Sequence, residues 1–405
     1  MGIELFENKK SCCGCGACAN ICPKGAITMK PDKWGYSYPV VDSSRCVSCG
    51  VCKKVCSYQN GISLHEPIRA YAAVNKTQQQ LEKSASGGVF SAVATYFLKN
   101  EGVVYGAALD FEGGHPIAHL VGIDDASQLW RLQGSKYVQS AVEQTYKQAK
   151  QNLDAGKKVL FSGTPCQIAG LYGYLKKEYV NLWTIDVICH GVPNLKFFDD
   201  YLSIEGKKRG GVPTGYSFRD KKRGWGMNAR LDLRYLSGKE KSTYIPARLT
   251  SYNTLFLDGD VYRENCYACP YARKERVSDM TIGDFWGIER EHPELLKQNE
   301  FDEKKGISCI LVNTQKAAEL CEKLSDRMYL YESSFMKIAK KNGQLDHPSA
   351  KSERRKTVME IYEKFGYDGV EKWFRKKYKK QIIMHRVYNA IPRKLRVALK
   401  NAIKK

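Results

Sequence analysis

The chain has 405 residues, of which 43% are hydrophobic and 27% charged, and its formal net charge is +22. A chain of this length and composition folds into two or three domains around a sizeable core. It has no run of about eighteen apolar residues, and its first residues have neither the apolar core of a secretory signal nor a myristoylation motif. We therefore expect a soluble cytoplasmic protein.

The positive charge is concentrated near the C-terminus. Residues 336–405 contain 21 Lys and Arg against 6 Asp and Glu, so the rest of the chain is only mildly basic. A nucleic-acid groove would spread positive charge over a folded domain, and we expect no nucleic-acid partner. The sequence instead indicates a basic C-terminal segment.

Fifteen cysteines are present, and nine of them precede Ser57. In a reducing compartment cysteines are more often metal ligands or catalytic thiols than disulfides. Their spacing near the N-terminus supports metal ligation.

Two cysteine motifs of the same form organise residues 1–60. In each, three cysteines lie two residues apart and a fourth follows after three more residues. Three such cysteines wrap a tight loop around a cubic [4Fe–4S] cluster, and the fourth reaches the other cluster across a pseudo-twofold axis. The predicted ligand sets are Cys12, Cys15, Cys18 and Cys56 for one cluster, and Cys22, Cys46, Cys49 and Cys52 for the other.

Structural zinc is the alternative for these cysteines, but zinc knuckles use two separate Cys-x-x-Cys pairs rather than three cysteines in one loop. The arrangement resembles a bacterial two-cluster ferredoxin, with Ser57 where the second motif of that family has a proline. A proline is not a ligand, so this departure leaves the predicted clusters unchanged. Cys13 is a spare thiol, which we interpret as a small buried side chain beside a cluster.

After a predicted linker up to about Pro67, the pattern changes to alternating strands and helices. Residues 69–75 predict a strand, and the sequence Ser-Ala-Ser-Gly-Gly at 84–88 leads into an amphipathic helix at 90–99. Backbone donors at a helix N-terminus can hold a phosphate, and a plain capped helix is the alternative.

A second Gly/Ser loop contains Gly134, Ser135 and Lys136. A lysine among such small residues is a candidate anion contact, although exposed lysines are common.

Residues 158–162 and 182–188 predict two buried strands, each followed by a cysteine. Cys166 begins the helix after the first strand, where the helix dipole stabilises a thiolate, and Cys189 follows the second. The carboxyl ends of neighbouring strands are where α/β sheets bind ligands. Cys266 and Cys269 add a Cys-x-x-Cys pair later in the chain.

These four cysteines equal the ligand count of a third [4Fe–4S] cluster. Two alternatives remain open from spacing alone: a thiol–imidazole catalytic pair of Cys166 and His190, or unrelated buried cysteines. We interpret Cys309 and Cys321, in a strand-like run and a helix, as packing residues.

Several motifs in one order are similar to the family of coenzyme F-420 hydrogenase/dehydrogenase beta subunits, over roughly residues 69–333. They are Ser84–Gly88, Gly134–Gln139, Gly163–Gln167, Cys189–Gly191, Phe218–Lys221, Cys266–Arg273 and Gly283–Gly287. The resemblance implies FAD, a [4Fe–4S] centre and hydride transfer between the flavin and a substrate such as the deazaflavin coenzyme. No G-x-G-x-x-G fingerprint is present, so FAD is expected from the resemblance alone.

The resemblance also assigns expected roles to particular residues. It favours the third cluster for Cys166, Cys189, Cys266 and Cys269, and makes Lys136, Arg219 and Trp225 candidates for positioning flavin or substrate. Asp284 is either a turn-capping or an active-site carboxylate. The expected flavin-side residues are Ser84, Ser86, Gly87, Gly88, Gly134, Ser135, Lys136 and Thr164.

The predicted architecture has three parts: an α+β ferredoxin-like dicluster domain (residues 1–60), a larger mixed α/β flavin domain (68–335) and a basic helical segment (350–405). In the last part, residues 370–378 predict one helix, and Pro392 begins or kinks another. The apolar face of this second helix would hold Ile391, Leu395, Ala398, Leu399 and Ala402. Such a basic amphipathic helix binds an anionic membrane, here on the cytoplasmic face, or an acidic redox partner; a solvated helix packed on the body is the alternative.

Two functions agree with these features. The first is a flavin- and iron–sulfur-dependent oxidoreductase that passes electrons between a small-molecule hydride donor or acceptor, FAD and the clusters, and on to a redox partner protein such as a ferredoxin. The second is a non-catalytic electron-transfer subunit that serves a partner enzyme, for example one in polysaccharide biosynthesis.

Overall fold

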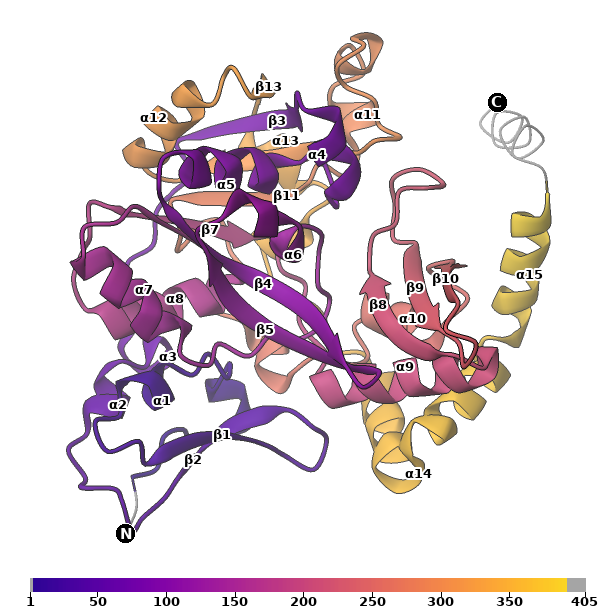
Figure 1. Cartoon of the computed structure of the whole chain (residues 1–405), viewed down its shortest axis with the longest axis horizontal. Helices are drawn as coiled ribbons and strands as arrows, with labels where there is room; N and C mark the ends of the chain where they lie inside the picture. Colours follow the sequence, from indigo (N-terminus) through magenta and orange to yellow (C-terminus); the bar gives the residue numbers. More distant parts are fainter. Residues whose placement is uncertain (1–2, 392–405) are drawn as a thin grey trace.

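The computed structural model describes residues 3–391. Its N-terminal region, drawn in indigo in Figure 1, contains two copies of one local structure. Helix α1 (Ala17–Ile21) follows Gly16, and α2 (Val51–Lys54) follows Gly50. Both glycines have left-handed φ values, 72° and 73°, which glycine adopts without strain. The two cysteine motifs therefore share one backbone geometry.

The rest of this region is short. A 3-10 turn, η1 (Lys9–Ser11), precedes α1, and strands β1 (Ile27–Pro31) and β2 (Ser37–Val41) form an antiparallel hairpin. The segment predicted as linker from Ser57 begins with a helix, α3 (Ser57–Asn60), so the connection to the main sheet starts after it.

A mixed eight-stranded sheet forms the centre of the molecule, with strand order β13-β3-β12-β11-β7-β6-β4-β5. Neighbouring strands β4, β6, β7 and β11 run parallel, and the remaining pairs are antiparallel. The strands predicted at 69–75, 158–162 and 182–188 are confirmed to within a residue. The bounds are β3 (Arg69–Asn75), β4 (Val103–Glu112), β5 (His115–Ile123), β6 (Val159–Gly163), β7 (Leu182–Val187), β11 (Met280–Asp284), β12 (Ser308–Val312) and β13 (Met328–Ser333).

Helices cover both faces of this sheet (Figure 1). On one face, α5 (Val89–Lys99) and α12 (Gln315–Lys323) pack over Val104, Leu160 and Ile185. On the other, α7 (Thr145–Asp154) and α8 (Pro165–Leu175) pack over the alternate strand residues. Successive side chains of a strand point to opposite faces of the sheet. Because helices cover both faces, the central strands are apolar on both.

A second lobe is built on an antiparallel sheet with the order β10-β9-β8, comprising β8 (Val212–Ser217), β9 (Ala229–Arg234) and β10 (Glu240–Ile245). Helices α9 (Leu195–Arg209), α10 (Ser251–Leu257) and α14 (Arg354–Lys377) share its hydrophobic core. Tyr36 and Tyr38 of the N-terminal hairpin also enter this core. The expected flavin domain thus includes a second sheet that the sequence pattern did not indicate.

The basic C-terminal segment begins with α14, which is packed on the body rather than free. Val358, Met359 and Val370 are fully buried in the second lobe, and the helix breaks at Gly366, where φ is 62°. Helix α15 (Lys379–Ala390) follows. The predicted helix beyond Ile391 lies outside the described residues. Within residues 3–391, no helix is both long and apolar enough to cross a membrane.

The remaining elements are short connections around the sheets. They are α4 (Gln78–Lys83), η2 (Ala126–Gln128), α6 (Leu129–Leu132), η3 (Glu264–Ala268), α11 (Ile288–Glu291), η4 (Leu295–Lys297), α13 (Phe335–Ala339) and η5 (Gly343–Leu345).

Candidate functional site

The structure brings together one predicted ligand set of the N-terminal region in a small pocket. Cys22, Cys46, Cys49 and Cys52 all line it, among apolar side chains that include Ile27 and Val41. The backbone amide of Ala26 donates to the Cys22 sulfur at 3.3 Å, the kind of contact that tunes an iron–sulfur cluster. Cys49 is exposed, so this site is open to a partner.

The other predicted set, Cys12, Cys15, Cys18 and Cys56, is more deeply enclosed. Burial, together with the neighbouring thiols of Cys15, Cys12 and Cys56, raises the pKa of Cys18. Burial also raises the pKa of Cys12 against the opposing effect of the Arg263 charge. Four thiols in one another's field become thiolates together only with positive charge between them, which iron supplies. The donor set therefore fits a [4Fe–4S] cluster.

In residues 3–391, no group of three or more His, Cys, Asp or Glu side chains is close enough to hold a single metal ion. Thiolates around a cubic cluster bind different irons and stand further apart than the ligands of one ion.

The other four candidate ligands, Cys166, Cys189, Cys266 and Cys269, line one cavity of about 520 Å³. Cys166 lies in the first turn of α8 after β6, Cys189 follows β7, and η3 contains Cys266. Strands β6 and β7 are parallel neighbours, so the predicted meeting of Cys166 and Cys189 at their carboxyl ends is confirmed.

The pKa values of these thiols reflect their proximity. Burial, together with the negative charge of Cys166, raises the pKa of Cys266 to about 12 and that of Cys269 to about 11. A hydrogen bond from Cys13 lowers the pKa of Cys166 to about 7. Within residues 3–391, no hydrogen bond joins Cys166 to His190; the Cys166 sulfur instead lies 3.2 Å from Thr164 Oγ1.

Cys13 links this cavity to the ferredoxin region. Its buried thiol lines the same cavity, and its interaction with the Cys15 and Cys166 sulfurs raises its pKa well above the usual value. The predicted burial of Cys13 is confirmed, but its position between two candidate clusters was missed. The only signal in the sequence was the doubled Cys12-Cys13.

Two glycines of α8 allow the ferredoxin region to approach this closely. A Cβ atom on Gly170 would lie 2.9 Å from the Cys15 sulfur, and one on Gly173 would lie 2.3 Å from the Val55 carbonyl oxygen. Both distances are too short for a real Cβ atom. At these two positions the backbone of α8 therefore lies directly against the ferredoxin region, and only glycine leaves room for it.

The cavity lies at the carboxyl ends of the parallel strands and gathers most of the expected flavin-side residues. Ser84, Ser86, Gly88, Gly134, Ser135, Lys136 and Thr164 all line it. Gly87 does not line the cavity. A Cβ atom there would lie 2.2 Å from the Ala73 carbonyl oxygen, so a glycine at this position lets the loop pack closely against β3. Lys221, whose pKa burial lowers to about 8, donates to the carbonyl oxygens of Leu81 and Ser86 and fixes this loop.

Lys136 is directed back toward its own chain. Its Nζ donates to the carbonyl oxygens of Arg131 and Gln133, both at 2.9 Å, at the end of α6. Burial lowers the pKa of Lys136 to about 7. Its ammonium therefore stabilises the turn around Gly134 while the rest of the side chain forms part of the wall.

Arg219 and Trp225 lie behind the cavity wall, where they hold three of its side chains. Arg219 forms an ion pair with Asp284 at 2.7 Å and donates to Tyr137 Oη at 2.9 Å. Trp225 Nε1 donates to Asp284 at 3.1 Å, and its ring stacks on Trp286 with centroids 4.4 Å apart. Asp284 is thus the centre of a polar cluster rather than a turn cap.

Two regions of the chain are similar to known families. A family model for the C-terminal part of coenzyme F420 hydrogenase/dehydrogenase beta subunits matches residues 156–337, and a model for a 4Fe-4S dicluster domain matches residues 11–60. A chain in a solved structure of the xenon-derivatised F420-reducing [NiFe] hydrogenase complex from Methanosarcina barkeri aligns with 74% of this chain and 93% of its own, at 13% identity and a TM-score of 0.40.

Three curated relatives match parts of the chain. The coenzyme F420-dependent sulfite reductase of Methanocaldococcus jannaschii is 27% identical over 40% of this chain and 24% of its own length. One of the subunits of the F420H2 dehydrogenase of Methanosarcina mazei is 24% identical over 38% of this chain and 46% of its own. An uncharacterized ferredoxin of Methanocaldococcus jannaschii is 34% identical over 14% of this chain and 71% of its own.

This chain thus spans less than half the length of the first two relatives. The predicted resemblance is nevertheless confirmed over the two matched regions. The chain thus carries the C-terminal region of the coenzyme F420 hydrogenase/dehydrogenase beta-subunit family and, ahead of it, a 4Fe-4S dicluster domain.

Proposed function

We propose that this protein passes electrons between a small-molecule hydride donor or acceptor, FAD and three [4Fe–4S] clusters, and on to a redox partner. One observation carries the proposal: the two Gly/Ser loops, four candidate cluster cysteines and Cys13 of the ferredoxin region line a single cavity. When bound, FAD would exchange two electrons with a substrate as hydride and one electron at a time with the clusters.

The cavity has features that fit a flavin nucleotide. Its volume, about 520 Å³, lies within the range of small-molecule sites. The wall includes the N-terminal turn of α5, which follows Gly88 in the left-handed conformation and has no side-chain cap. Backbone amides there would hold a phosphate group.

The polar cluster of Arg219 and Asp284 would position the flavin ring or the substrate. Arg219 lies behind the wall and acts through the two wall side chains that it binds, Asp284 and Tyr137. Arg219 also lies 5.4 Å from the Trp286 ring, a cavity-wall side chain. Trp225 supports that ring by stacking.

The deazaflavin coenzyme is the substrate we propose, because two relatives are named for reactions with coenzyme F420. If the protein catalyses its own hydride transfer, reduced deazaflavin or a nicotinamide donor bleaches its flavin. If it only connects a partner enzyme, the flavin is reduced through ferredoxin or dithionite alone.

Placing a tryptophan at Ser135 tests the FAD site directly. Ser135 lines the cavity, so Ser135→Trp is expected to reduce FAD from about one per chain to a small fraction while iron content stays at the wild-type level. Flavin and iron are counted after anaerobic purification. The matched control is Ser127→Trp, at an exposed position outside the cavity. Full FAD occupancy in Ser135→Trp would place the flavin elsewhere.

We also propose that α15 contacts an anionic membrane surface. Ile383, Met384 and Val387 lie on α15 and are each more than half exposed, beside Lys380 and Arg386. Apolar side chains flanked by basic ones suit a surface of anionic lipid.

Replacing Ile383, Met384 and Val387 together with serine is expected to reduce co-sedimentation with phosphatidylglycerol vesicles severalfold, without loss of iron. Vesicles of phosphatidylcholine alone should bind neither protein. Val180→Ser, which removes an even more exposed apolar side chain from another part of the surface, serves as the control. Undiminished sedimentation of the triple variant would exclude α15 as the contact.

A further inference from the structure

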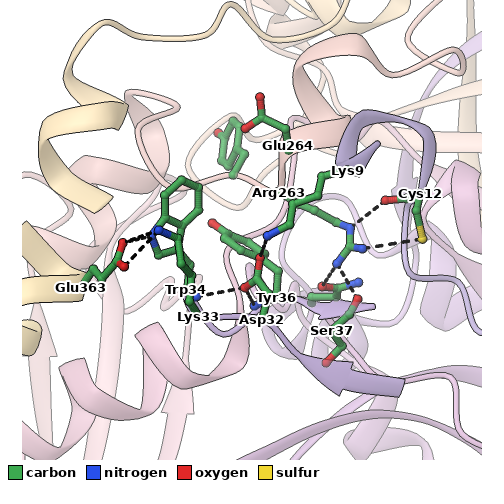
Figure 2. A network of polar contacts seen from close by, with 12 residues as sticks. Lys9, Cys12, Asp32, Lys33, Trp34, Tyr36, Ser37, Arg263, Glu264 and Glu363 are labelled. Carbon is green, nitrogen blue, oxygen red and sulfur yellow. Dashed lines mark hydrogen bonds and ion pairs between the residues drawn. The ribbon is translucent and has the colours of Figure 1, made fainter. Parts of the chain in front are cut away.

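Arg263 is buried at the junction between the ferredoxin region and the cavity. It directly precedes η3, which contains Cys266, and its exposure is 0%. Figure 2 shows its guanidinium among residues of the N-terminal region, beside Cys12. The side chain therefore lies between two candidate cluster sites that belong to different parts of the fold.

The guanidinium makes specific contacts with that region. It donates to the carbonyl oxygens of Cys12 at 3.1 Å and Ser37 at 2.8 Å, and to Gln139 Oε1 at 3.3 Å. One nitrogen lies 3.9 Å from the Cys12 sulfur, and the charge lies 3.9 Å from the Tyr38 ring centroid. All of these protein partners are neutral groups or a thiol.

Among the described residues, no carboxylate lies within ion-pair distance of Arg263. The acid next in sequence, Glu264, pairs with Lys351 and Arg355. The nearby Asp32 pairs with Lys9, as Figure 2 shows. A buried cation without a counter-ion is strongly disfavoured. The cluster thiolates are the anions that its surroundings offer.

Arg263 approaches one candidate ligand directly. Among the predicted cluster cysteines in residues 3–391, Cys12 is the one whose sulfur a guanidinium nitrogen of Arg263 contacts.

We propose that Arg263 is the counter-ion of the cluster held by Cys12 and, through its charge, raises the reduction potential of that cluster. This rests on the proposed function, in which electrons pass between this cluster and the cavity. Reduction adds one electron to the cluster and moves no atom, and a fixed positive charge stabilises the more negative state. Arg263 is thus a positioning residue, which also holds the ferredoxin region in place.

The test is a potentiometric titration of the anaerobic holoprotein, with dithionite as reductant and electron paramagnetic resonance as readout. The signal of the Cys12 cluster is assigned by its loss in Cys18→Ala. Arg263→Gln is expected to shift the potential of the Cys12 cluster to more negative values. Arg263→Lys keeps the positive charge, so its potential should lie much closer to that of the wild type. The cluster of Cys22, Cys46, Cys49 and Cys52 is the internal reference and should not move.

A second variant leaves Arg263 in place. Gln139→Glu puts a carboxylate of nearly the same shape against the guanidinium and should give the same negative shift, even if Arg263→Gln loads its clusters poorly. Gln139→Met, equally long but neutral, should leave the potential unchanged. An unaltered potential in Gln139→Glu, or equal shifts in the Glu and Met variants, would overturn the proposal. A low iron count in the wild type would instead contradict the third cluster.

Discussion

Replacing Cys266 with alanine is expected to lower the iron content from about twelve to about eight per chain, because one of three [4Fe–4S] clusters loses a ligand. Cys266 lines the cavity with Cys166, Cys189 and Cys269, far along the chain from the ferredoxin motifs. The two ferredoxin clusters keep all of their predicted ligands. Iron and acid-labile sulfide counts on anaerobically purified protein measure the difference.

The loss of this cluster should also interrupt electron transfer. With FAD bound, substrate should still bleach the flavin of Cys266→Ala. The ferredoxin clusters should keep the absorbance of their oxidised state, because the cluster that passes electrons from the flavin to them is missing.

The matched control for this variant is Cys309→Ala. Cys309 is fully buried in β12 and lies 3.6 Å from the Asp284 carbonyl oxygen, so its removal leaves a small cavity without touching a predicted ligand set. Its iron count should equal that of the wild type. About eight irons in the wild type, or equal counts in wild type and Cys266→Ala, would contradict the third cluster.

Replacing Asp284 with alanine is expected to destabilise the fold by about 3–5 kcal/mol, because it leaves a buried charge without its partner. The Arg219 side chain is only 1% exposed, and Asp284 accepts hydrogen bonds from both Arg219 and Trp225. Chemical denaturation measures the change through the unfolding midpoint. As a control, Glu322→Ala breaks the exposed pair with Arg69 and should not move the midpoint measurably.

A double variant separates the structural and functional roles of this pair. Arg219→Met with Asp284→Leu removes both charges and should recover much of the lost stability. If Arg219 positions flavin or substrate, hydride transfer stays low in this stable protein. Full transfer activity in the double variant would show that the pair only supports the fold.

The ferredoxin motifs were readable from sequence because their geometry is local. The cysteine spacing fixes which residues line each loop, and Gly16 and Gly50 provide the left-handed turns that start α1 and α2. The parallel strands before Cys166 and Cys189 were predictable for a related reason, since short apolar runs followed by turns mark β6 and β7. The cavity at their carboxyl ends follows from the rule for α/β sheets.

Other features depend on segments that meet only in the folded chain. The second lobe was missed although β9 alternates apolar and polar residues. Its neighbours give little signal, because β8 contains a proline and a glycine and β10 is mostly polar. The packing of the C-terminal segment on the body was one of the alternatives that the sequence left open. The charge pattern of α14 is that of a solvated helix, while a few residues, such as Val358 and Met359, decide its burial.

By itself, the sequence determined the two cysteine motifs, the central strands and the family resemblance. Only the tertiary structure decided that Cys13 lies between Cys15 and Cys166, that Asp284 pairs with Arg219, and that Arg263 faces Cys12 without a carboxylate partner. The physical reason is the distance along the chain over which each signal acts. Cysteine spacing and strand periodicity act over a few residues of backbone, whereas the pairing of a buried charge depends on which distant groups the packed fold places around it.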